Sequence, residues 1–279
     1  MVHWRGMLCW STSNVRLAFY SIEPGLTFAG FTVLHEKIMQ TEVCSPQALA
    51  DPTKWSELPF PNASLHLPRE RFKIDAVEST FPFMGRKVFT TVYQKVLDFP
   101  GTSRSILSLQ GAAGSGKSHI LAALTCLLMK EGKRVVYMPD VREFAASMVG
   151  YLRNALLLAY APNPELCEII FASKTISSLV EFVRERSGAG EAIYIICDQM
   201  NALDHDPTRV DRVDDERKDL AMSCIDDLVT ESHSIWSASG NCGMATTDNC
   251  RQTSGAQHII FRYGYQGVCS ILKVIWGPC

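Results

Sequence analysis

The sequence predicts an α/β fold, in which a parallel sheet carries helices on both faces, and three observations support this class. The chain has 279 residues, 47% of them hydrophobic and 20% charged, so it can bury a large core. From Arg104 onward, short apolar segments alternate with longer segments of helical period. This alternation is typical of parallel strands joined by helical crossovers. A glycine-rich stretch also joins the first of these apolar segments to the helical segment that follows it.

Four short apolar segments predict the strands, at residues 105–110, 133–139, 191–199 and 234–239. Apolar residues at helical spacing predict helices at 83–99, 117–132, 141–160, 176–188 and 211–233. Gly132 is placed to end the second of these helices. The prolines of residues 161–165 break the pattern and begin a further helix.

The first 70 residues differ from the rest of the chain. Residues 44–68 contain five prolines among mixed aromatic residues, which interrupt any regular element. We therefore predict a small header and linker at residues 1–70, whose fold the sequence does not assign. The main domain is predicted at residues 71–279.

The glycine-rich stretch, GAAGSGKS at residues 111–118, matches the phosphate-loop pattern G-x(4)-G-K-[ST] in full. Its glycines allow backbone torsions and a close approach that a Cβ would block, so that successive N–H groups can surround phosphate oxygens. Lys117 is expected to reach the β- and γ-phosphates, and Ser118 to complete a magnesium shell. The predicted nucleotide-binding residues are Gly111, Ala112, Ala113, Gly114, Ser115, Gly116, Lys117, Ser118 and His119.

An acidic residue at the end of a neighbouring strand is needed to orient the magnesium ion. The apolar segment IYIIC is followed at once by Asp198, which is the predicted second metal residue. Gln199 follows in a position where many related ATPases have a glutamate as general base. Glutamine can hold a water molecule but cannot accept its proton, so hydrolysis is expected to be slow or to use Asp204 or Asp206.

Other polar residues leave alternatives open. Asn241, after the last predicted strand, either positions the water or is a plain loop residue. Three arginines lie among many carboxylates in the sequence, at Arg209, Arg212 and Arg217. This pattern favours a solvated helix face over an arginine finger. Because the chain has no N-K-x-D motif that reads guanine, the expected nucleotide is ATP.

Composition and hydropathy give no support for several classes of function. The net charge of −2 gives no bulk argument for nucleic acid or membrane binding. No segment reaches the ~18 apolar residues of a membrane span, and the N-terminus has no sustained apolar run of a secretory signal. The chain is therefore expected to be soluble, with an intracellular location as the fallback. Its ten cysteines form no C-x-x-C pair, and those inside apolar segments are expected to be buried thiols.

Several segments together resemble the ATPase module of Crinkler effectors, which is shared with retrotransposon hot spot proteins. They are GRKVFTTVYQKVL, GAAGSGKSHILAAL, GKRVVYMPDVREF, IYIICDQMNALD and SASGN, within about residues 75–260. The resemblance implies a P-loop NTPase of AAA-like or STAND-like kind, with the Asp198–Gln199 pair as the family's own pattern. It also implies an effector that is secreted and acts in a host cell, including its nucleus, on a host protein or nucleic acid.

The sequence departs from that family at both ends. The start lacks an LFLAK-type segment, and the tail YGYQGVCSILKVIWGPC resembles the expected glycine and tryptophan segment only loosely. We therefore expect a domain truncated at its C-terminal lid. Two functions stay open: a magnesium-dependent ATPase that drives a conformational cycle, in a homo-oligomer, or a nucleotide-gated binding module with little turnover. A small-molecule phosphotransferase is disfavoured because no arginine-rich lid is evident.

Overall fold

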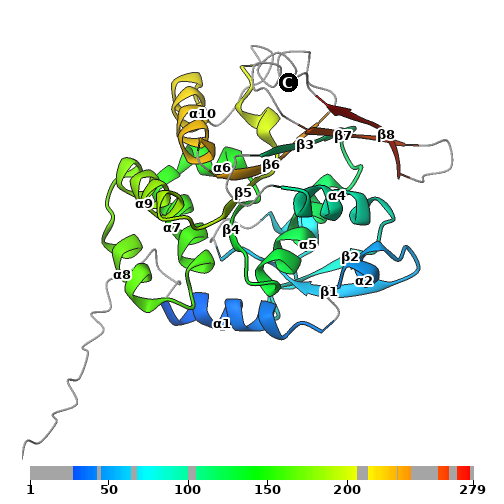
Figure 1. The fold of residues 1–279 in the computed structure, drawn as a ribbon, viewed down its shortest axis with the longest axis horizontal. Coiled ribbons are helices and arrows are strands. Elements are labelled where there is room, and N and C mark those ends of the chain that lie inside the picture. The colour runs from blue at the N-terminus through cyan, green and yellow to red at the C-terminus, as the bar shows by residue number, and fades with distance from the viewer. Residues whose placement is uncertain are drawn as a thin grey trace, which may run out of the picture.

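A computed structural model shows two sheets and the helices that pack on them (Figure 1). It describes residues 28–42, 45–63, 68–99, 105–205, 213–230 and 232–239, together with the backbone of 257–263 and 269–276. The larger sheet has six strands in the order β4-β5-β6-β3-β7-β8. In that order the strands are Arg134–Met138, Ile193–Cys197, His233–Ser239, Ile106–Gly111, Gln257–Tyr263 and Cys269–Trp276.

The parallel sheet predicted from the sequence is confirmed. Strands β4, β5, β6, β3 and β7 pair in parallel, and β8 adds an antiparallel edge beside β7. All four predicted strands are present. No strand was predicted after residue 239, and β7 and β8 are additional strands there. Both segments are rich in β-branched and aromatic residues, and β7 pairs along the otherwise open edge of β3.

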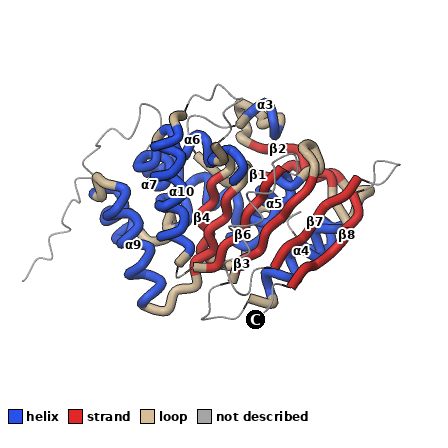
Figure 2. Tube along the Cα trace, turned by 90° about the horizontal axis from the view of Figure 1, so that it is seen from above, coloured by secondary structure: helices blue, strands red, loops and turns tan. Residues whose placement is uncertain are grey.

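Helices flank the large sheet, as predicted. Figures 1 and 2 show α4 (Val88–Leu97) and α5 (Lys117–Lys130) on one side of this sheet, and Figure 1 shows α10 (Asp215–Val229) on the other. The remaining helices of the main domain are α6 (Val141–Ala146), α7 (Met148–Ala159), α8 (Pro164–Ala172), α9 (Ile176–Gly188) and the short 3-10 helix η1 (Met200–Leu203). Gly132 follows α5 with φ +78°, which fits its predicted role as the helix stop.

Two predicted helices differ from the structure. The segment at 141–160 is two helices, because Ser147 has an extended φ of −146° between α6 and α7. The segment at 83–99 begins as a strand, and its helix starts only at Val88. Gly85 makes the turn between them, where an added Cβ would lie 2.7 Å from the carbonyl carbon of Asp51.

The described part of the predicted header packs on the main domain. It contains α1 (Phe28–Gln40), α2 (Pro46–Ala50) and β1 (Trp55–Pro59), and α3 (Arg69–Phe72) crosses its end. Strand β1 pairs antiparallel with β2 (Thr80–Met84), so one small sheet joins residues on both sides of the predicted boundary at 70. Helix α1 and strand β1 contact α5 on the side away from the large sheet, and the Cys126 thiol of α5 contacts the carbonyl of Pro59.

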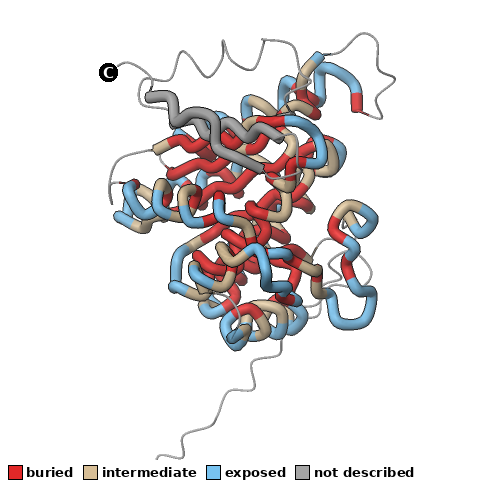
Figure 3. Tube along the Cα trace, turned by 90° about the vertical axis from the view of Figure 1, so that its right-hand side faces the viewer, coloured by how far each residue is buried: buried red, intermediate tan, exposed pale blue. Residues whose placement is uncertain are grey.

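The core lies between the large sheet and its helices, and Figure 3 shows β3, β4, β5 and β6 buried along most of their length. The four described cysteines in apolar segments are buried free thiols, as expected, and they are Cys126, Cys167, Cys197 and Cys224. Among the residues that the structure describes, no helix has both the length and the apolar character that crossing a membrane requires.

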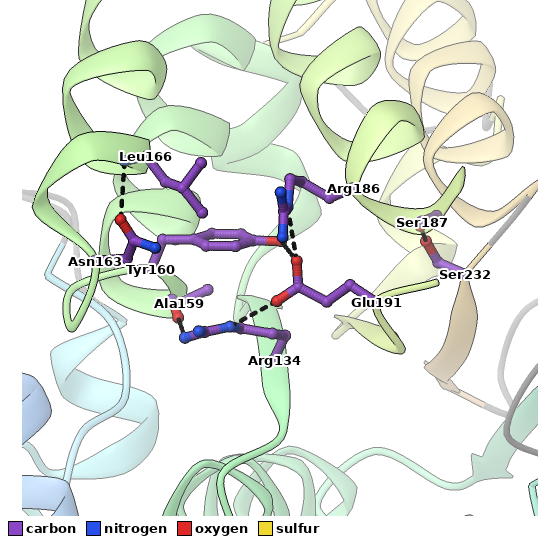
Figure 4. Close-up of polar contacts among 9 residues, drawn as sticks. All are labelled: Arg134, Ala159, Tyr160, Asn163, Leu166, Arg186, Ser187, Glu191 and Ser232. Atoms are coloured by element: carbon purple, nitrogen blue, oxygen red, sulfur yellow. Dashed lines mark hydrogen bonds and ion pairs between the residues drawn. The ribbon is translucent and has the colours of Figure 1, made fainter. Parts of the chain in front are cut away.

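A polar cluster joins the amino ends of β4 and β5 to α7 and α9 (Figure 4). Glu191 accepts from Arg134 Nε at 2.8 Å, from Arg186 Nε at 2.9 Å and from the Tyr160 hydroxyl at 3.1 Å. Burial alone would raise the pKa of Glu191, but these hydrogen bonds together lower it. The cluster lies at the opposite end of the parallel strands from the phosphate loop, so we interpret it as structural.

Candidate nucleotide-binding site

The phosphate loop joins the end of β3, at Gly111, to the start of α5, at Lys117. Gly114 and Gly116 have φ values of +77° and +82°, in the left-handed region that glycine adopts without strain. A Cβ on Gly116 would lie 2.6 Å from Nη2 of Arg86, whose Nη1 donates to the Ser115 carbonyl at 3.1 Å. The glycines therefore have the torsional role that the sequence predicts.

The loop presents open backbone at its tip and a buried cation inside. Residues 112–114 are exposed, whereas Lys117 is only 7% exposed. The Lys117 ammonium donates to the carbonyls of Gly111 at 2.7 Å and Ala112 at 2.9 Å, and to the Ser115 hydroxyl at 3.2 Å. The first N–H groups of α5 have no acceptor within their own helix, as at every helix start. Amide donors and a positive charge thus lie together at one point of the fold.

Asp198 lies at the carboxyl end of β5 and is completely buried. The Ser237 hydroxyl donates to its Oδ1, and the side chain of Ser118 in the phosphate loop lies close enough to lower its pKa. Its Oδ2 lies 3.5 Å from Nη2 of Arg71. Burial raises the pKa of Asp198, and Arg71, Ser237 and Ser118, in decreasing order, oppose that rise.

The sequence led us to expect Asp198 on the strand next to the phosphate-loop strand. In the structure these two strands are not adjacent. Strand β6 lies between β5 and β3 and pairs with both. It brings Ser237, 2% exposed, between the two halves of the site. Besides bonding to Asp198, the Ser237 hydroxyl accepts from the backbone N–H of Gln199 at 3.2 Å. Ser237 was missed from the sequence, where it is one serine among several in an apolar strand.

Gln199 directly follows Asp198 and has φ +65°, the left-handed region. A residue with a Cβ held there costs about 1–3 kcal/mol and persists only when its surroundings fix it. Its N–H bond to Ser237 is one such constraint. The side chain expected to handle water therefore stands on a strained backbone next to the predicted metal residue.

His119 follows Ser118 on α5 and packs against the segment that precedes the loop. Its ring centroid lies 4.9 Å from that of Phe72 and 6.1 Å from that of Phe81. Burial, and then the charges of Arg86, Arg71 and Lys73, lower its pKa to about 4. These three cations lie in the residues before the phosphate loop and gather around its first helical turn.

The other candidates lie away from these contacts or outside the description. Asp204 follows η1, half-buried, and its carbonyl accepts from Lys218 Nζ at 3.4 Å. Arg217 is exposed on α10 and donates to the Ala146 carbonyl at 2.9 Å, in agreement with a solvated helix face. Asp206, Arg209, Arg212 and Asn241 lie outside the described residues.

The residues present fit a magnesium nucleotide. Ser118 and Asp198 are hard oxygen ligands in mutual contact, the kind that Mg²⁺ prefers. Asp198 Oδ2 is buried with no hydrogen-bond partner among the described residues, so this oxygen keeps acceptor capacity. Positive-φ glycines and Lys117 supply the anion side of the site.

The sheet order, the loop between β3 and α5, and an acidic residue ending a strand two places away decide the architecture. The chain has a P-loop NTPase fold. No model of a known protein family matches it, and no curated protein matches it either.

Solved structures similar to the chain include a DNA replication initiation factor, at 17% identity and TM-score 0.34, over 55% of this chain and 37% of that one. AMPPCP-bound DnaA from Aquifex aeolicus matches at 15% identity and TM-score 0.32, over 63% and 43%. A KaiC-like protein from Pyrococcus horikoshii matches at 13% identity and TM-score 0.35, over 63% and 81%. The chain thus spans less than half the length of the first two. At such scores, the fold class rests on the chain's own strand order and loop.

Proposed function

We propose that this chain binds ATP with Mg²⁺ and hydrolyses it to drive a conformational cycle. The contact between Ser118 of the phosphate loop and the buried Asp198 carries this proposal, because it brings the two halves of a nucleotide site together. Ser118 and Asp198 would hold the metal, and Lys117 with the amides of residues 112–119 would hold the phosphates. Magnesium, when bound, neutralises charge on the phosphate oxygens.

The chain's own residues suit the orientation of a water molecule better than its deprotonation. Gln199 is the residue next to Asp198, and a glutamine side chain donates and accepts hydrogen bonds without titrating. Ser237 fixes the backbone of Gln199 and the carboxylate of Asp198 at once. Slow turnover is the expected consequence, since no carboxylate stands in place of Gln199 to take the proton.

Gln199 also favours a second candidate function, a nucleotide-gated binding module with little or no turnover. In that case the strained backbone at Gln199 would belong to a switch that responds to the bound nucleotide. The two candidates share the binding site and differ only in phosphate release.

We further propose the Crinkler and retrotransposon hot spot kinship, with an AAA-like or STAND-like module. The segments GAAGSGKS, VVYMPD and DQMNAL support it, and the strands that carry them surround the site. An effector role in a host cell, a host protein or nucleic-acid partner and a homo-oligomer follow from that kinship alone.

Phosphate release from ATP distinguishes the two candidate functions. We expect slow release by the unaltered chain, faster release by Gln199→Glu, which supplies a base, and none by Lys117→Met. Asp204→Asn tests the alternative base that the sequence offers, and slower release by this variant would show that Asp204 takes the proton. No release by the unaltered chain, with ATP still bound, would favour the binding module.

A further inference from the structure

Arg71 lies on α3, a short helix that precedes the phosphate-loop strand by more than thirty residues. In the chain, α3 lies between β1 and β2, the two strands of the small sheet. Its Nη2 is 3.5 Å from Asp198 Oδ2 and donates to the Pro139 carbonyl just after β4. The guanidinium carbon lies 4.9 Å from the ring centroid of Phe72, the next residue. The side chain is 23% exposed, whereas that of Asp198 is completely buried.

These contacts hold the Asp198 carboxylate from two sides. Ser237 in the sheet holds Oδ1, and Arg71, from outside the sheet, faces Oδ2. A buried carboxylate requires a charge partner or several donors, because removing it from water costs several kcal/mol. Arg71 itself has two buried nitrogens, Nε and Nη1, without a hydrogen-bond partner among the described residues. Its guanidinium is therefore held by the hydrogen bond to the Pro139 carbonyl and by the ion pair with Asp198.

The neighbours of Arg71 connect it to the phosphate loop as well. Phe72 stacks near the ring of His119, which follows the metal residue Ser118 on α5. Helix α3 thus touches both sides of the nucleotide site, through Arg71 on the Asp198 side and through Phe72 on the loop side. A mere surface helix would touch neither.

We propose that Arg71 is a positioning residue of this site, which holds the Asp198 carboxylate in the orientation that supports Mg²⁺ beside Ser118. The inference rests on the proposed function and deepens it, because it makes the segment before the phosphate loop a working part of the nucleotide site. Residues that orient metal-binding groups typically change metal affinity 10–100-fold when they are removed.

Two other roles for Arg71 give different results. A purely structural tie would weaken the fold when broken, and would change nucleotide affinity equally with and without metal. If Arg71 instead competes with Mg²⁺ for Asp198, its removal would increase the gain in nucleotide affinity that Mg²⁺ gives. If Arg71 is a positioning residue, its removal decreases that gain in affinity.

The test is the dissociation constant of a fluorescent ATP analogue, measured in Mg²⁺ and again in EDTA, for the full chain and its variants. We expect the ratio of the EDTA constant to the Mg²⁺ constant to fall about tenfold or more in Arg71→Ala. Arg69→Ala is the matched control, because it removes the same charge from the exposed side of the same helix, and its ratio should equal that of the unaltered chain.

Arg71→Lys keeps a charge but loses the planar fork, so its ratio should lie between those of the unaltered chain and Arg71→Ala. If Arg71→Ala does not fold, Arg71→Lys decides, and a ratio equal to that of the unaltered chain overturns the proposal. For a folded Arg71→Ala, an unchanged or higher ratio overturns it. If the unaltered chain does not bind the analogue, the proposed function fails and this inference fails with it. If the unaltered chain binds the analogue more tightly in Mg²⁺ than in EDTA, the proposed function stands and the variants test only the role of Arg71.

Discussion

Ser237→Ala tests the link between the two strands that build the site. The hydroxyl makes two hydrogen bonds in a buried position, one donated to the Asp198 carboxylate and one accepted from the Gln199 N–H. A hydrogen bond to a charged group contributes about 1.5–3 kcal/mol, and a neutral one about 0.5–1.5 kcal/mol. Together they predict a loss of about 2–4 kcal/mol in the free energy of unfolding.

Urea unfolding followed by circular dichroism measures this loss, with Ser234→Ala as the matched control. Ser234 lies on the same strand, β6, and is also completely buried, but its hydroxyl has no hydrogen-bond partner among the described residues. Removing that hydroxyl should be nearly neutral or stabilising. The reasoning is refuted if Ser237→Ala loses no more stability than Ser234→Ala.

Three further predictions concern the first helical turn after the phosphate loop, the loop itself and the polar cluster around Glu191. Because the pKa of His119 is lowered to about 4, the unfolded chain binds a proton between pH 6.5 and 4 that the folded chain does not. The free energy of unfolding should therefore fall as the pH drops through that range, by about 1–2 kcal/mol from His119 after allowance for partial exposure, and His119→Gln should reduce the pH dependence by that amount in urea titrations. Gly116→Ala should cost about 1–2 kcal/mol, because φ is +82° there and the new methyl would displace Arg86; an unchanged urea midpoint would contradict this. Glu191→Gln should lower stability by about 1–2 kcal/mol, since it weakens the bonds from Arg134 and Arg186, and should leave the affinity for ATP unchanged; a loss of affinity would show that this cluster is part of the site.

The sequence predicted the parts of the site that local pattern determines. Residues 111–118 follow a fixed spacing, because the loop needs glycines at given torsions before a helix, and Asp198 is conspicuous as the first acidic residue after an apolar strand. Ser237 could not be found in this way. Its role depends on β6 lying between β5 and β3, and strand order is a long-range property that periodicity does not encode.

Arg71 and the C-terminal strands show the same limit. Arg71 lies just after the proline-rich residues 44–68, in a segment with no periodic signal, and only the packing of α3 on α5 brings it to Asp198. The segment of β8 has the composition of a strand. It was not predicted as one, because it was compared with the glycine and tryptophan segment that the Crinkler family has at this place. The non-helical torsions of Ser147, which divide a continuous helical pattern, likewise have no signal in the composition.

Magnesium-dependent ATP binding tests the central claim most directly. Isothermal titration of the chain with ATP, in Mg²⁺ and in EDTA, should show one site per chain whose affinity is higher with Mg²⁺. Lys117→Met should abolish binding in both conditions, and Asp198→Asn should abolish only the gain from Mg²⁺. The account is contradicted if the unaltered chain is folded and binds no ATP, or if Lys117→Met binds ATP as well as the unaltered chain does.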